Sequence, residues 1–136
     1  MSKLLARAKA KRANVINSYQ QMSLDDAYID ECCYNLQQGI EFCLKYVVEM
    51  LGESYVETHD IRAQLNILKK LNAEIPCEKE LRMLASTLNS WEAETRYNDN
   101  FVALIEDIDD AIIILDKLIS YSEGLAEYKA FLDQHK

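Results

Sequence analysis

Apolar residues recur along this chain every three or four positions, which is the period of an amphipathic helix. The clearest run has steps of four, three, four, four, three and four residues and comprises Ile29, Cys33, Leu36, Ile40, Leu44, Val47 and Leu51. Gly52 follows this run directly, and glycine is common just after the C-terminus of a helix. We therefore expect this helix to end near Gly52 and to form the centre of the domain.

Four further segments carry the same periodicity. They predict a first helix at about residues 2–21, a third with apolar positions from 61 to 71, a fourth from 81 to 91 and a fifth starting near residue 100. Ser23 and Thr58 are the expected N-caps of the second and third helices. Residues 123–136 are expected to form a short additional helix or a tail. Since no segment alternates with period two, the sequence predicts an all-α fold, an antiparallel bundle of about five helices.

Composition agrees with one folded helical domain. The chain has 136 residues, of which 49% are hydrophobic, three are glycine and one is proline; this suits a single domain over residues 1–136 with few hairpin turns. The N-terminus is basic, but it lacks the apolar stretch of a secretory signal. The longest apolar run, Ala111 to Leu115, is far shorter than the roughly 18 residues of a spanning helix. We expect no membrane association and a cytoplasmic location.

Charge is distributed unevenly along the chain. The net charge is −8, but residues 1–12 hold +5 and the remaining residues hold −13. An acidic domain binds nucleic acid poorly without specific contacts, because such binding depends on neutralising phosphates. The basic first helix is expected to be a solvated face or to meet acidic surface on the protein or a partner.

No metal or cofactor site is indicated. A zinc site needs ligands in closely spaced pairs, and this spacing is absent from the four cysteines, which are Cys32, Cys33, Cys43 and Cys77. The two histidines are far apart in the sequence. We expect reduced, mostly buried thiols, no bound metal and no cofactor.

Arg96 is the most notable single residue, because it stands among carboxylates just before the most apolar part of the chain. Glu92, Glu94 and Asp99 surround it in the sequence, and Tyr97 follows it. Arg96 is either a structural ion pair near a helix end or a ligand for an anion, since its planar fork suits phosphate. In the second case Tyr97 is available to stack on a base.

Two segments resemble the HEPN family, the nucleotide-binding helical domains of prokaryotes and higher eukaryotes. In the first, the matching positions are Gln38, Glu41, Leu44 and Lys45, followed by His59, Asp60 and Ile61. In the second, they are Leu88 and Asn89 followed by Arg96 and Tyr97. The resemblance implies a fold of about five helices, a homodimer and a functional cleft near the Arg-Tyr pair. It makes Arg96, Tyr97, Gln38, Glu41 and Lys45 the candidate ligand-binding residues.

In the RNA-cleaving members of this family, four to six residues lie between the arginine and a histidine that follows it. In this chain the corresponding positions hold Phe101, Val102 and Ala103. Metal-free RNA cleavage needs a group that moves protons as well as a cation, so the motif is incomplete and no catalytic residue is assigned.

The resulting hypothesis is a non-catalytic homodimeric module. It binds a nucleotide-like ligand or a protein partner such as a nucleotidyltransferase antitoxin. The alternative is a metal-independent ribonuclease toxin with a degenerate motif, in which Arg96 works with His59 or Tyr97. The dimer is expected because Ile113, Ile114 and Leu118 widen the apolar stripe of the last long helix beyond one face. Glu41 and Lys45, four residues apart, are expected to form a weak surface pair.

Overall fold

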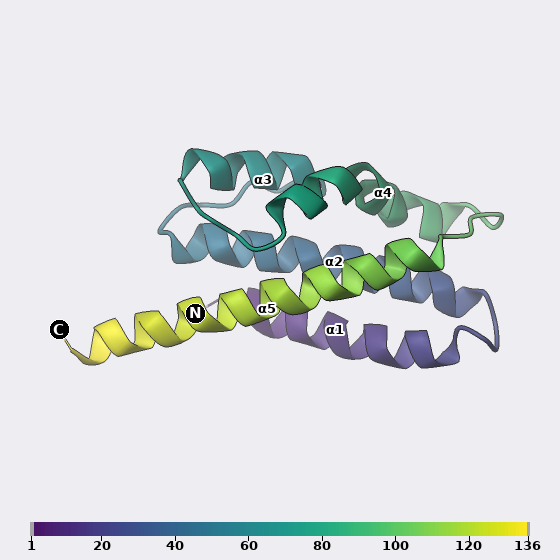
Figure 1. Cartoon of the computed structure of the whole chain (residues 1–136), viewed down its shortest axis with the longest axis horizontal. Helices are drawn as coiled ribbons and strands as arrows, with labels where there is room; N and C mark the ends of the chain where they lie inside the picture. The colour runs from purple at the N-terminus through teal and green to yellow at the C-terminus, as the bar shows by residue number, and fades with distance from the viewer. Residues whose placement is uncertain (1, 136) are drawn as a thin grey trace.

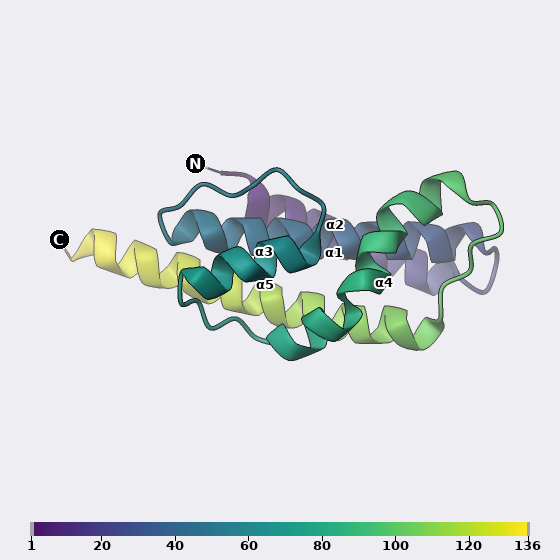
Figure 2. The same ribbon diagram turned by 90° about the horizontal axis from the view of Figure 1, so that it is seen from above.

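A computed structural model describes residues 2–135 and contains five helices and no strand over that range. The helices are α1 (Leu4–Gln21), α2 (Ala27–Met50), α3 (Ile61–Lys70), α4 (Glu78–Tyr97) and α5 (Ile105–Gln134). Helices α1, α2 and α5 run along the long axis of the molecule, α3 and α4 are stacked over α2, and α4 crosses the bundle obliquely (Figures 1 and 2). The all-α bundle expected from the sequence is confirmed.

Helix α2 is the centre of the bundle, since α1, α3, α4 and α5 all pack against it. Its predicted apolar stripe lies in the core, where Leu36, Ile40 and Leu44 have no exposed surface. Figures 1 and 2 together show that two connections lie at one end of the bundle. These are the turn between α1 and α2, at residues 22–26, and the loop between α4 and α5, at residues 98–104.

Two of the expected helix caps are wrong by two or three positions. Asp26, not Ser23, is the N-cap of α2, and the side chain of Asp25 accepts a hydrogen bond from the backbone N–H of Ala27. Asp60, not Thr58, is the N-cap of α3. In both cases a carboxylate at the start of the helix replaces the expected hydroxyl, and the macrodipole favours it there. Gly52 has a φ of +82° just beyond α2, as expected of a residue that ends a helix.

Helix α5 differs most from the sequence prediction. It begins at Ile105 rather than near residue 100, and it continues without interruption to Gln134. Residues 123–134 are therefore the end of α5, not a separate short helix or a tail. Ile114 and Leu118 are buried in the core of this chain, whereas Ile113 remains 53% exposed. Ile114 and Leu118 therefore do not contribute to an exposed apolar face for a dimer, and the sequence prediction is wrong for these two residues.

Helices α1 and α5 run antiparallel and are joined by polar contacts along their length. Arg12 Nη2 donates to Asp116 Oδ2 at 3.0 Å, and Lys9 pairs with Glu123 at 3.1 Å. These basic residues of α1 therefore meet acidic residues of the same chain, one of the two arrangements expected from the charge distribution. No helix within residues 2–135 combines the length and hydrophobicity that crossing a bilayer requires.

Candidate functional site

Arg96 lies in the last turn of α4 and is tied to that helix by its own neighbours. Its guanidinium forms an ion pair with the carboxylate of Glu92, one turn earlier. Its Nε also donates to the backbone carbonyl of Glu92 at 3.1 Å. The side chain is 45% exposed, so the ion pair is largely solvated. Two of the five N–H donors of Arg96 are thus already used within α4.

The guanidinium of Arg96 faces a polar hollow between α2 and α4. This hollow has a volume of about 290 Å³ and is lined by Asp30, Glu31, Tyr34, Thr95 and Arg96. Arg96 Cζ lies 5.7 Å from the centre of the Tyr34 ring, within reach of a cation–π contact. Two carboxylates and one guanidinium line the hollow, so it is an acidic site rather than a cationic one.

Tyr34 also separates this hollow from a second one between α1 and α2. Lys11 Nζ lies 5.3 Å from the ring centre of Tyr34. The second hollow has a volume of about 460 Å³ and is lined by Lys11, Asn14, Asn17, Ser18, Tyr28, Glu31, Tyr34 and Asn35. The tyrosine is therefore flanked by two cations, one from α1 and one from α4.

The acidic surroundings of the hollow affect the pKa of the Asp30 carboxyl. Partial burial raises the pKa of its carboxyl above the ordinary value, and the neighbouring charges of Asp26, Glu31 and Asp99 raise it further. A raised pKa means that the folded protein disfavours the ionised form. Since Asp99 belongs to the loop before α5, its influence on Asp30 also shows that this loop and the start of α2 lie near each other.

We predict that Asp30→Asn raises the melting temperature at pH 7 by about 1–2 °C. The folded-state pKa of Asp30 is raised, so its ionisation destabilises the fold as pH rises through that pKa, and protonation removes the effect at lower pH. The gain should therefore vanish near pH 3. Asp110→Asn, at an exposed position on α5, is the matched control. A gain that is independent of pH would show that repulsion at Asp30 is not its cause.

Glu41 and Lys45 form a buried pair, not the weak surface pair expected. They are 2% and 5% exposed, and Lys45 Nζ lies 2.8 Å from Glu41 Oε1. Gln37 Nε2 donates to Glu41 Oε2 at 2.8 Å, and His59 Nδ1 lies 3.0 Å from the same oxygen. The carboxylate thus has three partners, as a buried charge requires.

This network holds the loop between α2 and α3. Lys45 lies 3.7 Å from the carboxylate of Glu57 and 5.4 Å from the centre of the Tyr55 ring. The amide of Gln64 donates to the backbone carbonyl of Val56 at 2.9 Å. The loop is thereby fixed across α2, so the geometry of Glu41 and Lys45 is explained by a structural role.

The Leu-Asn part of the second sequence motif is also structural. Asn89 Oδ1 accepts a hydrogen bond from the backbone N–H of Ile61 at 3.0 Å, and its Nδ2 donates to Asp60 Oδ1 at 3.0 Å. Asn89 therefore satisfies the first turn of α3, whose N–H groups have no partner within the helix. Asp60 accepts from Arg62 as well, and Leu88 is fully buried.

The five candidate ligand-binding residues do not form one site. Arg96 and Tyr97 lie at the end of α4, and Tyr97 is exposed and absent from the lining of the hollow. Glu41 and Lys45 lie with His59 beside the α2–α3 loop. Gln38, half-buried, lies between the two groups along α2 and donates to Gln37 Oε1 at 3.1 Å.

His59 and Arg96 contact different parts of α2. Arg96 lies over Tyr34 and His59 contacts Glu41. These contacts are seven residues apart in the sequence, or about 10 Å along a helix axis. The other histidine, His135, follows α5 and lies at the far end of the bundle from the α4–α5 loop (Figure 1). Neither imidazole is placed beside Arg96.

Sequence reasoning missed Tyr34, Asp30, Glu31 and Lys11 as neighbours of Arg96. Part of the signal was available, because Tyr34, Gln38, Glu41 and Lys45 follow one another by four, three and four residues and so share one face of α2. The approach of Lys11 was not available, since it depends on how α1 packs on α2.

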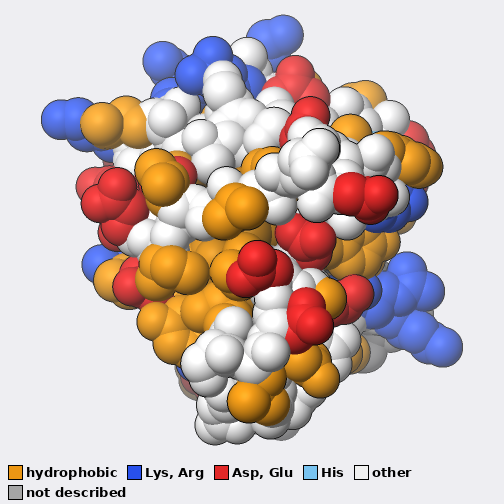
Figure 3. All heavy atoms as spheres, turned by 90° about the vertical axis from the view of Figure 1, so that its right-hand side faces the viewer, with side chains coloured by type: hydrophobic (Ala, Val, Ile, Leu, Met, Phe, Trp, Pro, Cys, Tyr) orange, Lys and Arg blue, Asp and Glu red, His pale blue; other side chains and the backbone are white. Residues whose placement is uncertain are grey.

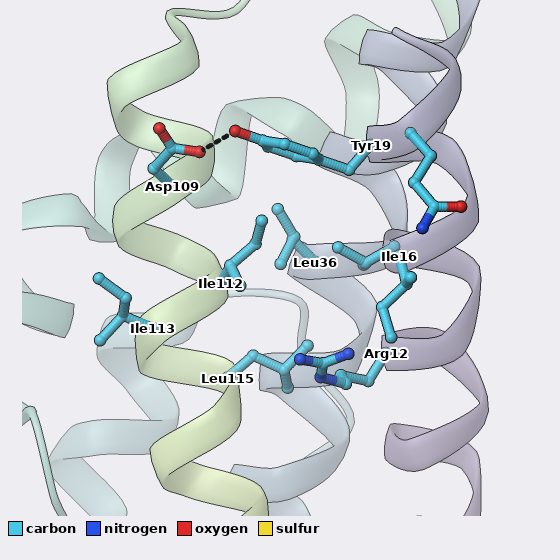
Figure 4. Close-up of a pocket in the computed structure, with 10 residues that line it drawn as sticks. Arg12, Ile16, Tyr19, Leu36, Asp109, Ile112, Ile113 and Leu115 are labelled. Carbon is cyan, nitrogen blue, oxygen red and sulfur yellow. Dashed lines mark hydrogen bonds between the residues drawn. The ribbon is translucent and has the colours of Figure 1, made fainter.

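A separate, apolar groove lies between α1 and α5. It has a volume of about 460 Å³ and is lined by Arg12, Val15, Ile16, Tyr19, Gln20, Leu36, Asp109, Ile112, Ile113 and Leu115. Figure 4 shows Ile16 and Ile112 facing each other across its middle, with Tyr19 hydrogen-bonded to Asp109 at one end. Ile113 also lines a hollow of about 430 Å³ between α4 and α5.

The described part of the chain shows no cluster of metal ligands, and three of its four cysteines are buried. Within residues 2–135, no three or more His, Cys, Asp or Glu side chains are placed to hold a metal ion. Cys32 and Cys43 are buried, and burial raises the pKa of the Cys32 thiol to about 11 and that of the Cys43 thiol to about 12. Such thiols are protonated at neutral pH and are poor nucleophiles.

Comparison with known proteins gives a family and a fold. The family model of the HEPN domain matches residues 1–125. The crystal structure of TT1696 from Thermus thermophilus is similar to this chain, with a TM-score of 0.62 and 21% sequence identity over 92% of this chain and 99% of that one. At that identity the likeness supports the fold alone. A comparison with curated proteins gave no significant match.

Proposed function

The chain belongs to the HEPN domain family, and we propose that it is a non-catalytic module that binds a protein partner at the end of the bundle near Arg96. The observation that carries this proposal is the environment of Arg96. Its guanidinium is paired with Glu92 and faces a hollow lined by Asp30 and Glu31. A phosphate in that hollow would meet two carboxylates, and like charges at close range oppose binding.

The lack of a histidine beside Arg96 supports the non-catalytic part. Positions 101–103 hold Phe, Val and Ala, and His59 is engaged with Glu41 about two turns away along α2. A general base must lie within hydrogen-bond reach of the proton that it moves. The family resemblance suggests a nucleotidyltransferase-type protein, as in toxin–antitoxin pairs, as the first partner class to test.

A nucleotide-like ligand is the second candidate, and one observation favours it. Lys11 and Arg96 approach Tyr34 at 5.3 and 5.7 Å, so an aromatic ring and two cations lie together. The neighbouring hollow contains the amides of Asn14, Asn17 and Asn35, which are able to bond a base edge. Glu31 belongs to both hollows, however, and its charge disfavours a phosphate in either.

Incubation with RNA tests the non-catalytic part of the proposal. We expect purified protein to leave a structured RNA and a single-stranded RNA intact, both with and without EDTA. Arg96→Ala and His59→Ala are the matched variants. RNA cleavage that persists in EDTA and is lost in either variant would establish the ribonuclease alternative instead.

A further inference from the structure

The end of the bundle near Arg96 exposes an unusual number of large apolar side chains. Five such side chains are between 42% and 79% exposed, and they are Leu24, Tyr97, Val102, Leu104 and Ile105. Leu24 comes from the α1–α2 turn, Val102 and Leu104 come from the α4–α5 loop, and Tyr97 and Ile105 are the helix residues on either side of that loop. We name these five residues, together with the carboxylates of Asp25, Asp26 and Asp99, the acidic end surface. Clustered apolar exposure of this kind commonly marks an interaction site.

The charge at this end is almost entirely negative. Residues 22–34 contain four acidic residues and no basic one, and residues 92–110 contain seven acidic residues and only Arg96 as a base. Figure 3 looks onto this end: hydrophobic and acidic side chains are interspersed across its middle, and Lys and Arg side chains lie toward its edges. The one cation, Arg96, is neutralised by Glu92.

We propose that the acidic end surface is the docking site for a basic amphipathic segment of another protein. This inference rests on the proposed function and names the chemistry of its partner. Apolar side chains of the segment would cover Val102 and Leu104, and flanking lysines or arginines would meet Asp25, Asp26 and Asp99. Complementary charge steers such an encounter and fixes its orientation.

Helix α1 of a second copy fits this surface poorly. It carries four Lys or Arg residues and no acidic residue, but the exposed residues among them are alanines such as Ala6, Ala10 and Ala13. Alanine supplies little of the bulky apolar area that covering Val102 and Leu104 requires. A contact between the end of one copy and α1 of the next would also be head-to-tail, and such contacts build open chains unless the rotation closes.

The test uses a synthetic peptide of leucine and lysine, about four helical turns long, with helical periodicity. Two control peptides are used, one with every lysine replaced by glutamate and one with the same composition in an order that breaks the periodicity. We expect calorimetric titration to show binding of the first peptide alone. The double variant Val102→Ser, Leu104→Ser should weaken it about tenfold or more. Both side chains are exposed, so the fold should be retained, as melting curves will check.

Met83→Ser is the control, because Met83 is apolar and more exposed than Val102 or Leu104 but lies in the first half of α4. Absence of binding to the parent protein, or equal weakening by Met83→Ser, would overturn the docking site. So would light scattering in which the double variant converts an oligomer to a monomer, since that assigns the surface to a second copy. None of these outcomes affects the RNA assay, which reports separately on the non-catalytic function.

Discussion

Replacing Glu41 by alanine is expected to lower the free energy of unfolding by about 3–5 kcal/mol. The substitution leaves the ammonium of Lys45, which is 5% exposed, without the carboxylate oxygen that now lies 2.8 Å away. It also removes the group that His59 and Gln37 contact. Urea unfolding followed by circular dichroism measures the change.

Glu123→Ala is the control, since Glu123 forms a half-exposed pair with Lys9 and should cost less than about 1 kcal/mol. The double variant Glu41→Leu, Lys45→Met should recover most of the loss, because apolar residues of similar volume replace a buried ion pair at little cost. If Glu41→Ala costs no more than Glu123→Ala, the pair is hydrated in solution and the network does not hold the loop.

The second large effect concerns the homodimer, which remains a prediction. Ile113→Glu is expected to raise the dissociation constant of the dimer about 100-fold or more. Ile113 is 53% exposed and lines both the apolar groove between α1 and α5 and the hollow between α4 and α5, so a charge there should disrupt a contact without unfolding the chain. Light scattering over a range of concentrations measures the dissociation.

Tyr128→Glu, at an exposed position further along α5, is the control and should leave the mass unchanged. Ile114→Glu is unsuitable, because Ile114 is buried and a charge there should unfold the protein. A parent protein that is monomeric at micromolar concentration, or an Ile113→Glu variant that keeps the parent's mass, would contradict a dimer through this face.

The helices were largely predictable, because their periodicity reflects packing on one central helix. The burial of individual apolar residues on α5 was not predictable in the same way. Ile113 and Ile114 are adjacent and chemically identical, yet only Ile114 is buried, since α5 packs on both α2 and α4. Phe101 and Leu104 continue the spacing of α5 but precede it. Gly124 lies within α5 and does not end it, since an isolated glycine in a helix costs only about 1 kcal/mol.

The residues of the candidate site could be predicted from the sequence, but their burial and their contacts could not. The sequence placed Arg96 among carboxylates and Glu41 four residues before Lys45. It did not reveal the burial of that pair, because the burial depends on how residues 53–60 cross α2. It also gave no sign that Asp30 and Glu31 of α2 face Arg96, because that contact joins residues more than sixty positions apart.

The most direct test of the account is a set of melting curves with and without millimolar nucleotide. The parent, Arg96→Lys and Arg96→Ala are compared, because a ligand that binds only the native state raises the melting temperature. We expect no nucleotide-dependent shift in any of the three, and a slightly lower melting temperature for Arg96→Ala, which leaves Glu92 unpaired. A shift in the parent that shrinks in Arg96→Lys and disappears in Arg96→Ala would contradict the account and make Arg96 an anion ligand.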